Sequence, residues 1–344
     1  MNTHRLTVRV TNPAELLSVV PYTLGFQPRQ SLVILSFRNT GLLSVARIDL
    51  PETIEAAHHA DYRASLGNLA SVVHRHGAST VVLAGYGSAE LVGVAVQIAT
   101  DAFAAGGIPV REALRVGDGR YYSFTCPDPD CCPADGTPFD PTSTVVAATA
   151  TFAGIVAVSD RDELLTQLTP IGGAARQAFA EATAAACTRL VDRLDTAAGS
   201  GGDDDDLSPR TPFGRQLLHE GEQAVADARC CYRSGQILDD ERAAILTVLL
   251  NMPSVRDATA RDLTGEAWEL QMWADLVRRA EPDFVASSAN LLAICALGAG
   301  NGLLASLAVA RAIDAEPDNQ LARLLRHAID AGMSPGEVAA LLVS

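Results

Sequence analysis

The sequence predicts an N-terminal α/β domain with a mixed sheet, followed by an all-helical C-terminal region. Strand and helix patterns alternate through the first 150 residues, which is typical of α/β proteins. Beyond them, helical patterns follow one another without a strand pattern between them. Alanine is abundant and aromatic residues make up only 5%, which favours closely packed helices because small side chains let backbones approach.

The length of 344 residues predicts two or three domains. The predicted boundaries are an α/β domain at 1–150 with a cysteine-rich loop at 120–138, a helical extension at 151–198, a linker at 199–212 and a helical domain at 213–344. The linker, G-S-G-G-D-D-D-D-L-S-P-R-T-P, cannot pack into a core and is predicted to be flexible.

The chain begins with polar and apolar residues in alternation at 5–10, which predicts a strand. Asn12 then caps a helix, and Pro13 suits its first position. This helix is expected to end by Val20, because Pro21 follows.

The next patterns alternate between strand and helix. They predict a hairpin of strands at 31–37 and 42–50, a helix at 52–76, a buried strand at 80–84, a helix at 88–105, and a second hairpin at 110–116 and 120–125.

Only helices are predicted after that. The first lies at 141–154, and the second begins at a cap, Ser159, with Asp162 as its acidic partner. A long helix follows at 173–198, and another runs from Pro212 to near Gly235. The last two begin at caps: one runs from Asp239 to before Pro253, and one from Thr264 to Ala280.

A short repeat appears near the C-terminus. The letters A-E-P-D occur at 280–283 and again at 315–318, a period of 35 residues. This period is close to the roughly 34 residues of tetratricopeptide repeats and predicts tetratricopeptide-like helix hairpins. Trp268 and Trp273 project about 140° apart on one helix, so both cannot be buried against a single neighbour.

Charge and hydropathy exclude several classes of function. The formal net charge is -15 and there is no basic run, which argues against nucleic acid and anionic membranes as partners. No apolar stretch reaches the roughly 18 residues of a membrane span, and the N-terminus lacks a signal-peptide pattern. We therefore expect a cytoplasmic protein, in which the seven cysteines are thiols, metal ligands or redox groups.

The most unusual chemistry lies at 120–138, R-Y-Y-S-F-T-C-P-D-P-D-C-C-P-A-D-G-T-P, which follows a predicted strand as ligand-binding loops do in α/β sheets. A metal site, with zinc as the ion, is predicted at Cys126, Asp128, Cys131 and Cys132. A remote cysteine, Cys230 or Cys231, is an alternative fourth ligand.

Two other interpretations of the cysteine-rich loop stay open. Cys126 can form a redox-active disulfide with Cys131 or Cys132, since a short loop allows the required separation. Alternatively, the three residues are small buried thiols that hold a proline-rich turn.

Other candidate motifs are weak. Gly85-Tyr86-Gly87 lies between a strand and a helix, as in dinucleotide-binding turns, but Glu90 stands where the third glycine belongs. An acidic residue at a phosphate-binding helix start is unfavourable, so a flexible turn is the alternative. Four histidines, which have no metal-binding spacing and are expected to be solvated, lie in one predicted helix: His58, His59, His74 and His76.

Two segments carry a family resemblance: V-P-Y-T-L-G-F-Q-P-R-Q-S-L-V-I-L at 20–35 and G-R-Y-Y-S-F-T-C-P-D-P-D-C-C-P-A-D-G-T-P at 119–138. With its C-x-D-x-x-C-C-P pattern, the chain resembles over most of its length the domain of unknown function 4192 family, found mainly in actinobacteria. The resemblance implies a cytoplasmic bacterial protein and no particular activity.

Two function hypotheses follow. The first is a non-catalytic interaction or scaffold protein that binds a protein partner or itself, because the sequence shows helical hairpins and no catalytic constellation. The alternative is an enzyme, or a metal- or redox-dependent sensor, with its site in the loop between Cys126 and Cys132.

Overall fold

The computed structural model describes residues 10–55, 59–152, 157–159, 163, 166–198 and 209–343. The chain divides into two compact units, Met1–Glu163 and Leu164–Ser344. The strand predicted at 5–10 falls almost wholly outside the described residues. Asp162 and the first ten residues of the predicted linker, 199–208, also lie outside them.

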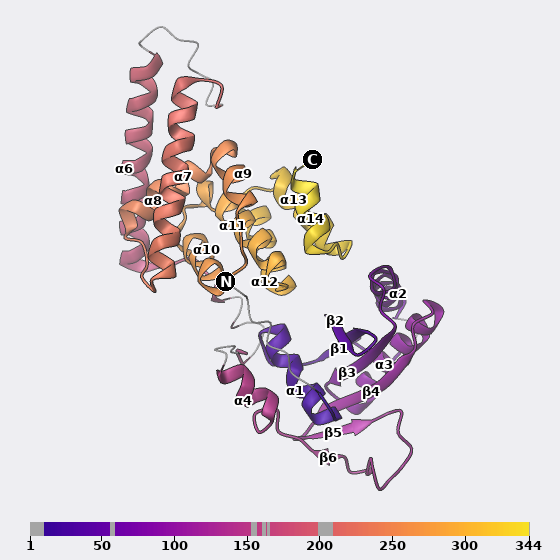
Figure 1. The fold of residues 1–344 in the computed structure, drawn as a ribbon. Coiled ribbons are helices and arrows are strands. Elements are labelled where there is room, and N and C mark those ends of the chain that lie inside the picture. Colours follow the sequence, from indigo (N-terminus) through magenta and orange to yellow (C-terminus); the bar gives the residue numbers. More distant parts are fainter. Residues whose placement is uncertain are drawn as a thin grey trace. The chain divides into compact units, whose positions relative to one another are not determined.

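The first unit contains a six-stranded mixed sheet in the order β2-β1-β3-β4-β5-β6 (Figure 1). Only β3 and β4 run parallel, while the other neighbouring pairs are antiparallel. The strands are β1 Ser31–Arg38, β2 Gly41–Asp49, β3 Thr80–Tyr86, β4 Val110–Gly117, β5 Arg120–Ser123 and β6 Thr137–Pro138. The predicted mixed sheet is therefore confirmed.

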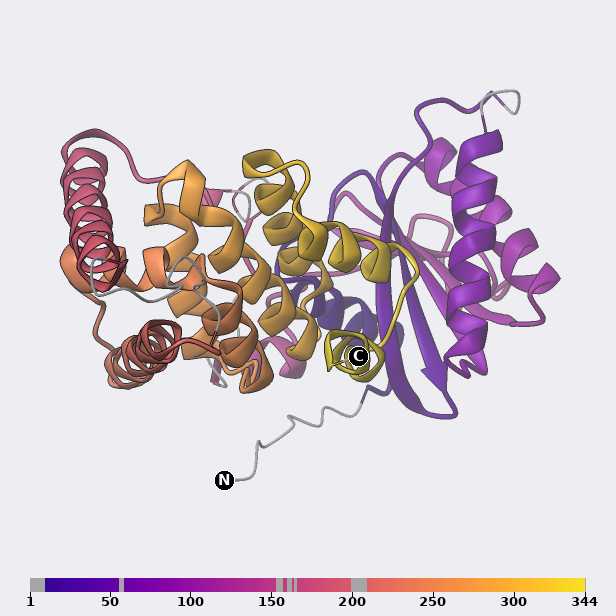
Figure 2. The same cartoon turned by 90° about the horizontal axis from the view of Figure 1, so that it is seen from above.

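Helices cover both faces of this sheet, because side chains alternate along each central strand. Leu32 and Ile34 of β1 pack with the helices α2 (Ala60–Arg75) and α3 (Ala89–Ala105), which lie together on one side of the sheet (Figures 1 and 2). Val33 and Leu35 point the other way, into a core shared with helix α1 (Pro13–Leu24). Helix α4 (Val145–Phe152) follows the sheet in the chain.

Helix α1 continues through the proline that was expected to end it. The predicted cap is confirmed, since the Asn12 side chain accepts a hydrogen bond from the Glu15 backbone N–H at 2.9 Å. Pro21 removes only one helical hydrogen bond, and the buried Leu17 and Val20 before it keep the helix on the sheet. The helix ends at Gly25, whose φ of 83° gives the left-handed cap that glycine favours.

Helix α2 begins at Ala60, later than the predicted start at residue 52. Local polar contacts compete with the helix, because the Thr53 hydroxyl accepts the Glu55 N–H at 3.2 Å and the Thr53 carbonyl contacts the His59 ring at 2.8 Å. His59 is consequently buried, so its predicted solvated position is wrong. His58 lies outside the described residues.

The Gly85-Tyr86-Gly87 turn is tightly packed. A Cβ atom on Gly85 would lie 2.2 Å from Cγ1 of Val92, and one on Gly87 would lie 2.6 Å from Cδ1 of Leu50. These glycines thus allow the end of β3 to pack closely against its neighbours, which accounts for them without a phosphate ligand.

The second unit is helical in the part that is described, as predicted. Its helices are α6 Gly173–Ala198, α7 Pro212–Arg233, α8 Asp240–Leu250, α9 Pro253–Arg261, α10 Ala267–Arg279, α11 Pro282–Gly298, α12 Gly302–Ala315, α13 Gln320–Asp330 and α14 Pro335–Val343. The cap predicted at Asp239 is confirmed by its bond from the Arg242 N–H at 2.8 Å. Helix α9 was not predicted, because Pro253 was interpreted as the end of one helix and is the first residue of the next.

Thr264 does not cap helix α10, whose N-cap is Glu266. The Thr264 hydroxyl and backbone N–H both donate to the Glu269 carboxylate, at 2.8 Å and 2.7 Å, so this residue belongs to the preceding turn. The expectation for the tryptophans is confirmed: Trp273 is fully buried, while Trp268 is partly exposed beneath the Arg233 guanidinium.

The tetratricopeptide-like hairpins are not confirmed. Helix α11 is buried along most of its length and packs against α8, α9, α10, α12 and α13, whereas a helix in a repeat array meets only its neighbours. The two A-E-P-D copies also differ, since Pro282 begins helix α11 while Pro317 lies in the turn before helix α13.

Candidate metal centre

The loop between β5 and β6 lies at one edge of the sheet (Figure 1). Three cysteine sulfurs meet in this loop. The Sγ atoms of Cys126, Cys131 and Cys132 all lie within 4.8 Å of one another. We call these three residues the cysteine triad. Among the described residues they form a group that could hold a metal ion, as the sequence predicted for the three cysteines.

Hydrogen bonds to the sheet hold the first side of the loop. The Ser123 hydroxyl accepts the Cys126 N–H at 3.0 Å and donates to Oε1 of Glu112, on the neighbouring strand β4, at 2.7 Å. The Thr125 hydroxyl donates to the same carboxylate oxygen. Cys126 is thereby anchored through β5 to β4.

A tight turn brings the vicinal cysteines back to Cys126. The Cys132 N–H donates to the Asp128 carbonyl at 2.7 Å, and the Asp128 side chain accepts the Asp130 N–H at 3.0 Å. Asp128 therefore shapes the turn, and its carboxylate is not among the ligand atoms gathered with the three sulfurs.

The second side of the loop is held at Gly136. Its φ of 81° and its position against the Tyr122 ring, where a Cβ would lie only 2.6 Å from a ring carbon, leave no room for a side chain. The Arg120 guanidinium donates to the Gly136 carbonyl at 2.6 Å, and Arg115 lies over the Tyr122 ring at 4.2 Å from its centroid. The loop is thus fastened at both ends independently of its cysteines.

The triad is open to solvent on one side, because Cys131 is exposed while Cys126 and Cys132 are half-buried. The hydrogen bond with the Cys126 sulfur, together with partial burial and the contact with Cys131, raises the pKa of the Cys132 thiol to about 12. Without a metal, at least this sulfur keeps its proton. A bound cation reverses that preference, because the thiolate is the metal ligand.

The remaining cysteines lie in the second unit. Cys187 is on α6, Cys230 and Cys231 are adjacent on α7, and Cys295 is buried on α11. Burial, with the nearby Glu269 carboxylate, raises the pKa of Cys295 to about 12, which makes it an inert core thiol.

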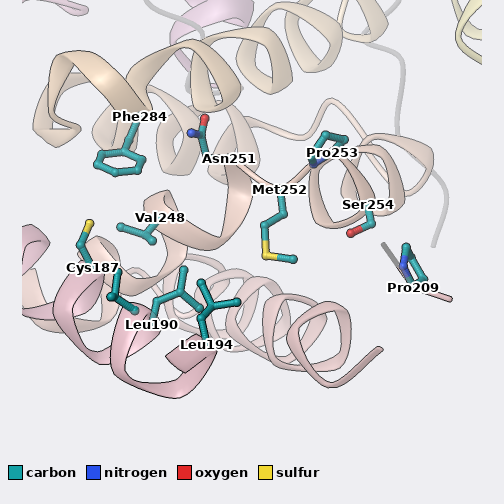
Figure 3. Close-up of a pocket in the computed structure, with 11 residues that line it drawn as sticks. Cys187, Leu190, Leu194, Pro209, Val248, Asn251, Met252, Pro253, Ser254 and Phe284 are labelled. Carbon is teal, nitrogen blue, oxygen red and sulfur yellow. The ribbon is translucent and has the colours of Figure 1, made fainter. Parts of the chain in front are cut away.

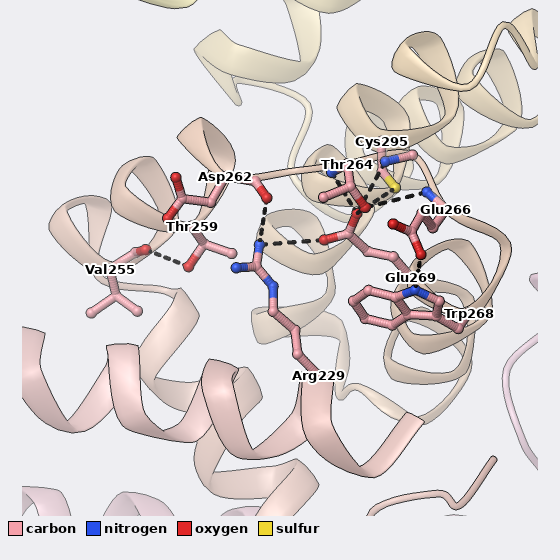
Figure 4. A network of polar contacts seen from close by, with 10 residues as sticks. Arg229, Val255, Thr259, Asp262, Thr264, Glu266, Trp268, Glu269 and Cys295 are labelled. Atoms are coloured by element: carbon pink, nitrogen blue, oxygen red, sulfur yellow. Dashed lines mark hydrogen bonds and ion pairs between the residues drawn. The ribbon is translucent and has the colours of Figure 1, made fainter. Parts of the chain in front are cut away.

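A buried polar network in the second unit was missed by sequence reasoning (Figure 4). The Glu269 carboxylate accepts the N–H groups of Thr264 and Gly265 at 2.7 Å and 3.1 Å, and pairs with the Arg229 guanidinium at 3.3 Å. Arg229 also donates to the Asp262 carbonyl at 3.1 Å. The network ties α7 to the turn before α10, and the only signal for it was an acidic residue in the first turn of a helix.

An apolar pocket of about 540 Å³ was also missed (Figure 3). It lies between helix α6 and the junction of α8 with α9, and Val191 at its rim is 52% exposed. Its lining is Cys187, Leu190, Val191, Leu194, Pro209, Val248, Asn251, Met252, Pro253, Ser254 and Phe284. Since the lining residues come from distant parts of the sequence, no local pattern predicts the pocket.

Comparisons with known proteins give one match. The family model described as Domain of unknown function (DUF4192) matches residues 13–336. No curated protein and no solved structure matches the chain. In the part of the chain that the structure describes, no helix is long and apolar enough to cross a membrane.

Proposed function

We propose that this chain, which belongs to the domain of unknown function 4192 family, binds one soft metal ion, zinc, on the thiolates of the cysteine triad. The family membership confirms the resemblance carried by residues 20–35 and 119–138, and it brings no activity with it. The proposal therefore depends on the chemistry of the loop.

The sulfur spacing supports the proposal. Zinc–sulfur bonds of about 2.3 Å in a tetrahedral site place two sulfurs about 3.8 Å apart. The Cys131 and Cys132 sulfurs are 3.9 Å apart, and all three lie within 4.8 Å of one another. A small ion fits among them with little movement of a loop that is already fastened to the sheet.

The metal has a structural role in this proposal. It joins the turn at Cys131 and Cys132 to Cys126, which is anchored to the sheet, in a segment otherwise rich in exposed residues. Binding is then coupled to the folding of the loop, because three thiols must lose their protons and come together. The thiols stay available in a reducing compartment such as the cytoplasm, where we place the protein.

Elemental analysis of full-length protein purified without chelators tests the proposal. We expect close to one zinc ion per chain. Cys131→Ser releases most of the metal and lowers the thermal stability of the first unit. The matched control is Cys230→Ser, an exposed cysteine on α7, which keeps the metal.

Metal-free protein with all three thiols freely titratable would contradict the proposal. Metal-free protein that lacks two thiols under non-reducing conditions would instead support a disulfide between Cys126 and Cys131 or Cys132.

A second candidate function is protein interaction through the second unit, and the apolar pocket favours it. Most of its lining is apolar, and contiguous apolar surface that reaches solvent, as at Val191, is typical of a site that a partner covers. With a net charge of -15, the fitting partner is a basic amphipathic helix that inserts an apolar side chain.

Binding of a synthetic Lys/Leu amphipathic peptide, followed by fluorescence anisotropy at two salt concentrations, tests this function. Val191→Asp weakens binding, and Val145→Asp, at an exposed valine of the first unit, is the control. Equal binding of the peptide by both variants would show that the pocket is not its binding site. Sedimentation of the protein alone detects self-association, in which a second copy of the chain covers this surface instead of the peptide.

A further inference from the structure

We infer that the metal at the cysteine triad has only three protein ligands and keeps one coordination position for a neutral ligand from solution, either water or a nitrogen donor of the imidazole class. The inference rests on the proposed metal binding and specifies what the same site accepts. It follows from the number of ligands, the exposure of the triad and the local charge.

Zinc takes four ligands, and the triad supplies three. In the described part of the chain, two of the nearby carboxylates have other partners. The Asp128 side chain accepts the Asp130 N–H at 3.0 Å, and Glu112 accepts the Ser123 hydroxyl at 2.7 Å. A site with three protein ligands and one exchangeable position is the arrangement of zinc sites that bind small molecules.

The open position can be reached from solvent. Cys131 is exposed, and so are the neighbouring Asp128 and Asp130. A small planar ligand can therefore approach without unfolding the turn that brings Cys132 to Cys126.

Local charge selects a neutral ligand. A divalent ion with three thiolates carries a net charge of -1, and the loop adds the carboxylates of Asp128, Asp130 and Asp135. The one basic residue of segment 120–138 is Arg120. Its guanidinium already lies 3.6 Å from the Asp135 carboxylate and donates to the Gly136 carbonyl. A fourth thiolate or a carboxylate adds a further negative charge to this acidic setting, whereas water or imidazole adds none.

The full-length protein with Co(II) in place of zinc provides the test, because the visible spectrum of Co(II) reports its ligands. We expect imidazole to change the spectrum saturably, at one equivalent per metal, and acetate to leave it unchanged. X-ray absorption of the zinc form is expected to show three sulfur neighbours and one lighter atom, and imidazole replaces the lighter atom.

Two variants separate the alternatives. Asp128→Asn keeps the side-chain acceptor of the turn and is expected to leave the imidazole response in place. It reduces the discrimination against acetate by up to about fivefold, because one nearby charge is lost. The double variant Cys230→Ser/Cys231→Ser is expected to leave the spectrum unchanged.

The outcomes distinguish this inference from the proposed function. A protein that binds neither zinc nor cobalt overturns the proposed function itself. A protein that binds metal with four sulfurs, or whose spectrum ignores imidazole, overturns only the open position. If the double cysteine variant alters the spectrum, the fourth ligand is a cysteine of α7. If Asp128→Asn abolishes the imidazole response, Asp128 has a role in the site. Either result also overturns the inference.

Discussion

The Glu269 carboxylate is fully buried, and protein groups balance its negative charge. Two backbone N–H groups, the Thr264 hydroxyl and the Arg229 guanidinium all point to it. A buried charge loses its interaction with water, so it is tolerated only when such partners replace that interaction. Removing the charge leaves Arg229, whose side chain is only 21% exposed, without its counter-ion.

Glu269→Gln is therefore expected to lower the free energy of unfolding of the second unit by about 2–4 kcal/mol. The glutamine keeps the shape of the side chain and one acceptor oxygen, but it loses the charge. Urea denaturation followed by circular dichroism measures the change. Glu266→Gln, at the exposed cap position of the same helix, is the control and is expected to stay within about 0.5 kcal/mol of the unchanged protein. Equal effects of the two variants would show that the buried ion pair contributes little.

The thiols are expected to differ strongly in reactivity. Cys295 has a pKa raised to about 12 by burial, so at pH 8 it stays protonated and shielded in the folded protein. Cys230 is exposed and is expected to react with a maleimide at the rate of an ordinary surface thiol. Mass spectrometry of peptides from native and urea-unfolded protein checks this. Labelling of Cys295 in the native protein at the rate of Cys230 would contradict the burial.

At the scale of elements, helices α7 and α9 approach closely at a glycine. A Cβ on Gly221 of α7 would lie 2.5 Å from Cγ1 of Val255 on α9. Glycine costs helix stability in itself, so its place here depends on the contact that it allows. Gly93 in α3 offers the contrast, because nothing lies within 4 Å of its added Cβ.

Gly221→Ala is expected to destabilise the second unit by about 1–3 kcal/mol, since the added methyl group overlaps a valine in a packed core. Gly93→Ala is expected to stabilise the first unit by up to about 1 kcal/mol, through helix propensity alone. Thermal denaturation of the two variants measures the sign of the stability change in each. Adding Val255→Ala to Gly221→Ala relieves the overlap and is expected to recover part of the loss. A gain in stability from Gly221→Ala alone would show that the two helices can separate without cost.

The Arg193–Glu220 pair joins α6 to α7 by two hydrogen bonds of 2.7 Å and 2.8 Å. The hydrogen bonds from Arg193 lower the pKa of Glu220 below its usual value of 4.5. A carboxyl group with a lowered folded-state pKa stabilises the protein above its unfolded pKa, and this stabilisation is lost as the pH falls through the folded value.

Glu220→Gln is therefore expected to reduce stability at pH 7 and to have little effect at strongly acidic pH. Because the Arg193 and Glu220 side chains are 39% and 34% exposed, we expect a loss of at most about 1 kcal/mol at pH 7. Denaturant titrations at several pH values measure it. A loss that is the same on both sides of pH 4.5 would assign the effect to shape rather than to charge.

At the scale of the whole molecule, the chain has separate cores in its two units. Helix α6, which precedes the Gly/Asp segment 199–208, contributes the fully buried Phe179 to the core of the second unit. The same core contains Phe213 and Leu217 of α7, which follows that segment. The two sides of the segment are therefore held together by packing.

Light proteolysis is expected to cut first within residues 199–208, because their Gly, Ser and Asp composition suits an exposed protease site. The two fragments are expected to stay associated, since Phe179 and Leu217 share one core. Size-exclusion chromatography of the nicked protein, with mass spectrometry of the peak, checks this. Early cuts within β1 or β3, or fragments that separate without denaturant, would contradict it.

The sequence by itself determined the features that depend on neighbouring residues. The caps at Asn12 and Asp239, the strands β1 to β5 and the position of the cysteine-rich loop depend on hydrogen bonds and apolar patterns within a few residues. Family membership was equally visible, because the motif residues are contiguous.

Only the tertiary structure decided which distant groups meet. It showed that α1 passes Pro21, because packing on the sheet outweighs one missing hydrogen bond, and that α11 is a central helix rather than part of a repeat array. It also distinguished the predicted ligands: Asp128 turns the chain, while Cys126, Cys131 and Cys132 converge. Spacing along the chain limits how far apart two sulfurs can lie, but their actual separation depends on the turn and on the sheet that anchors it.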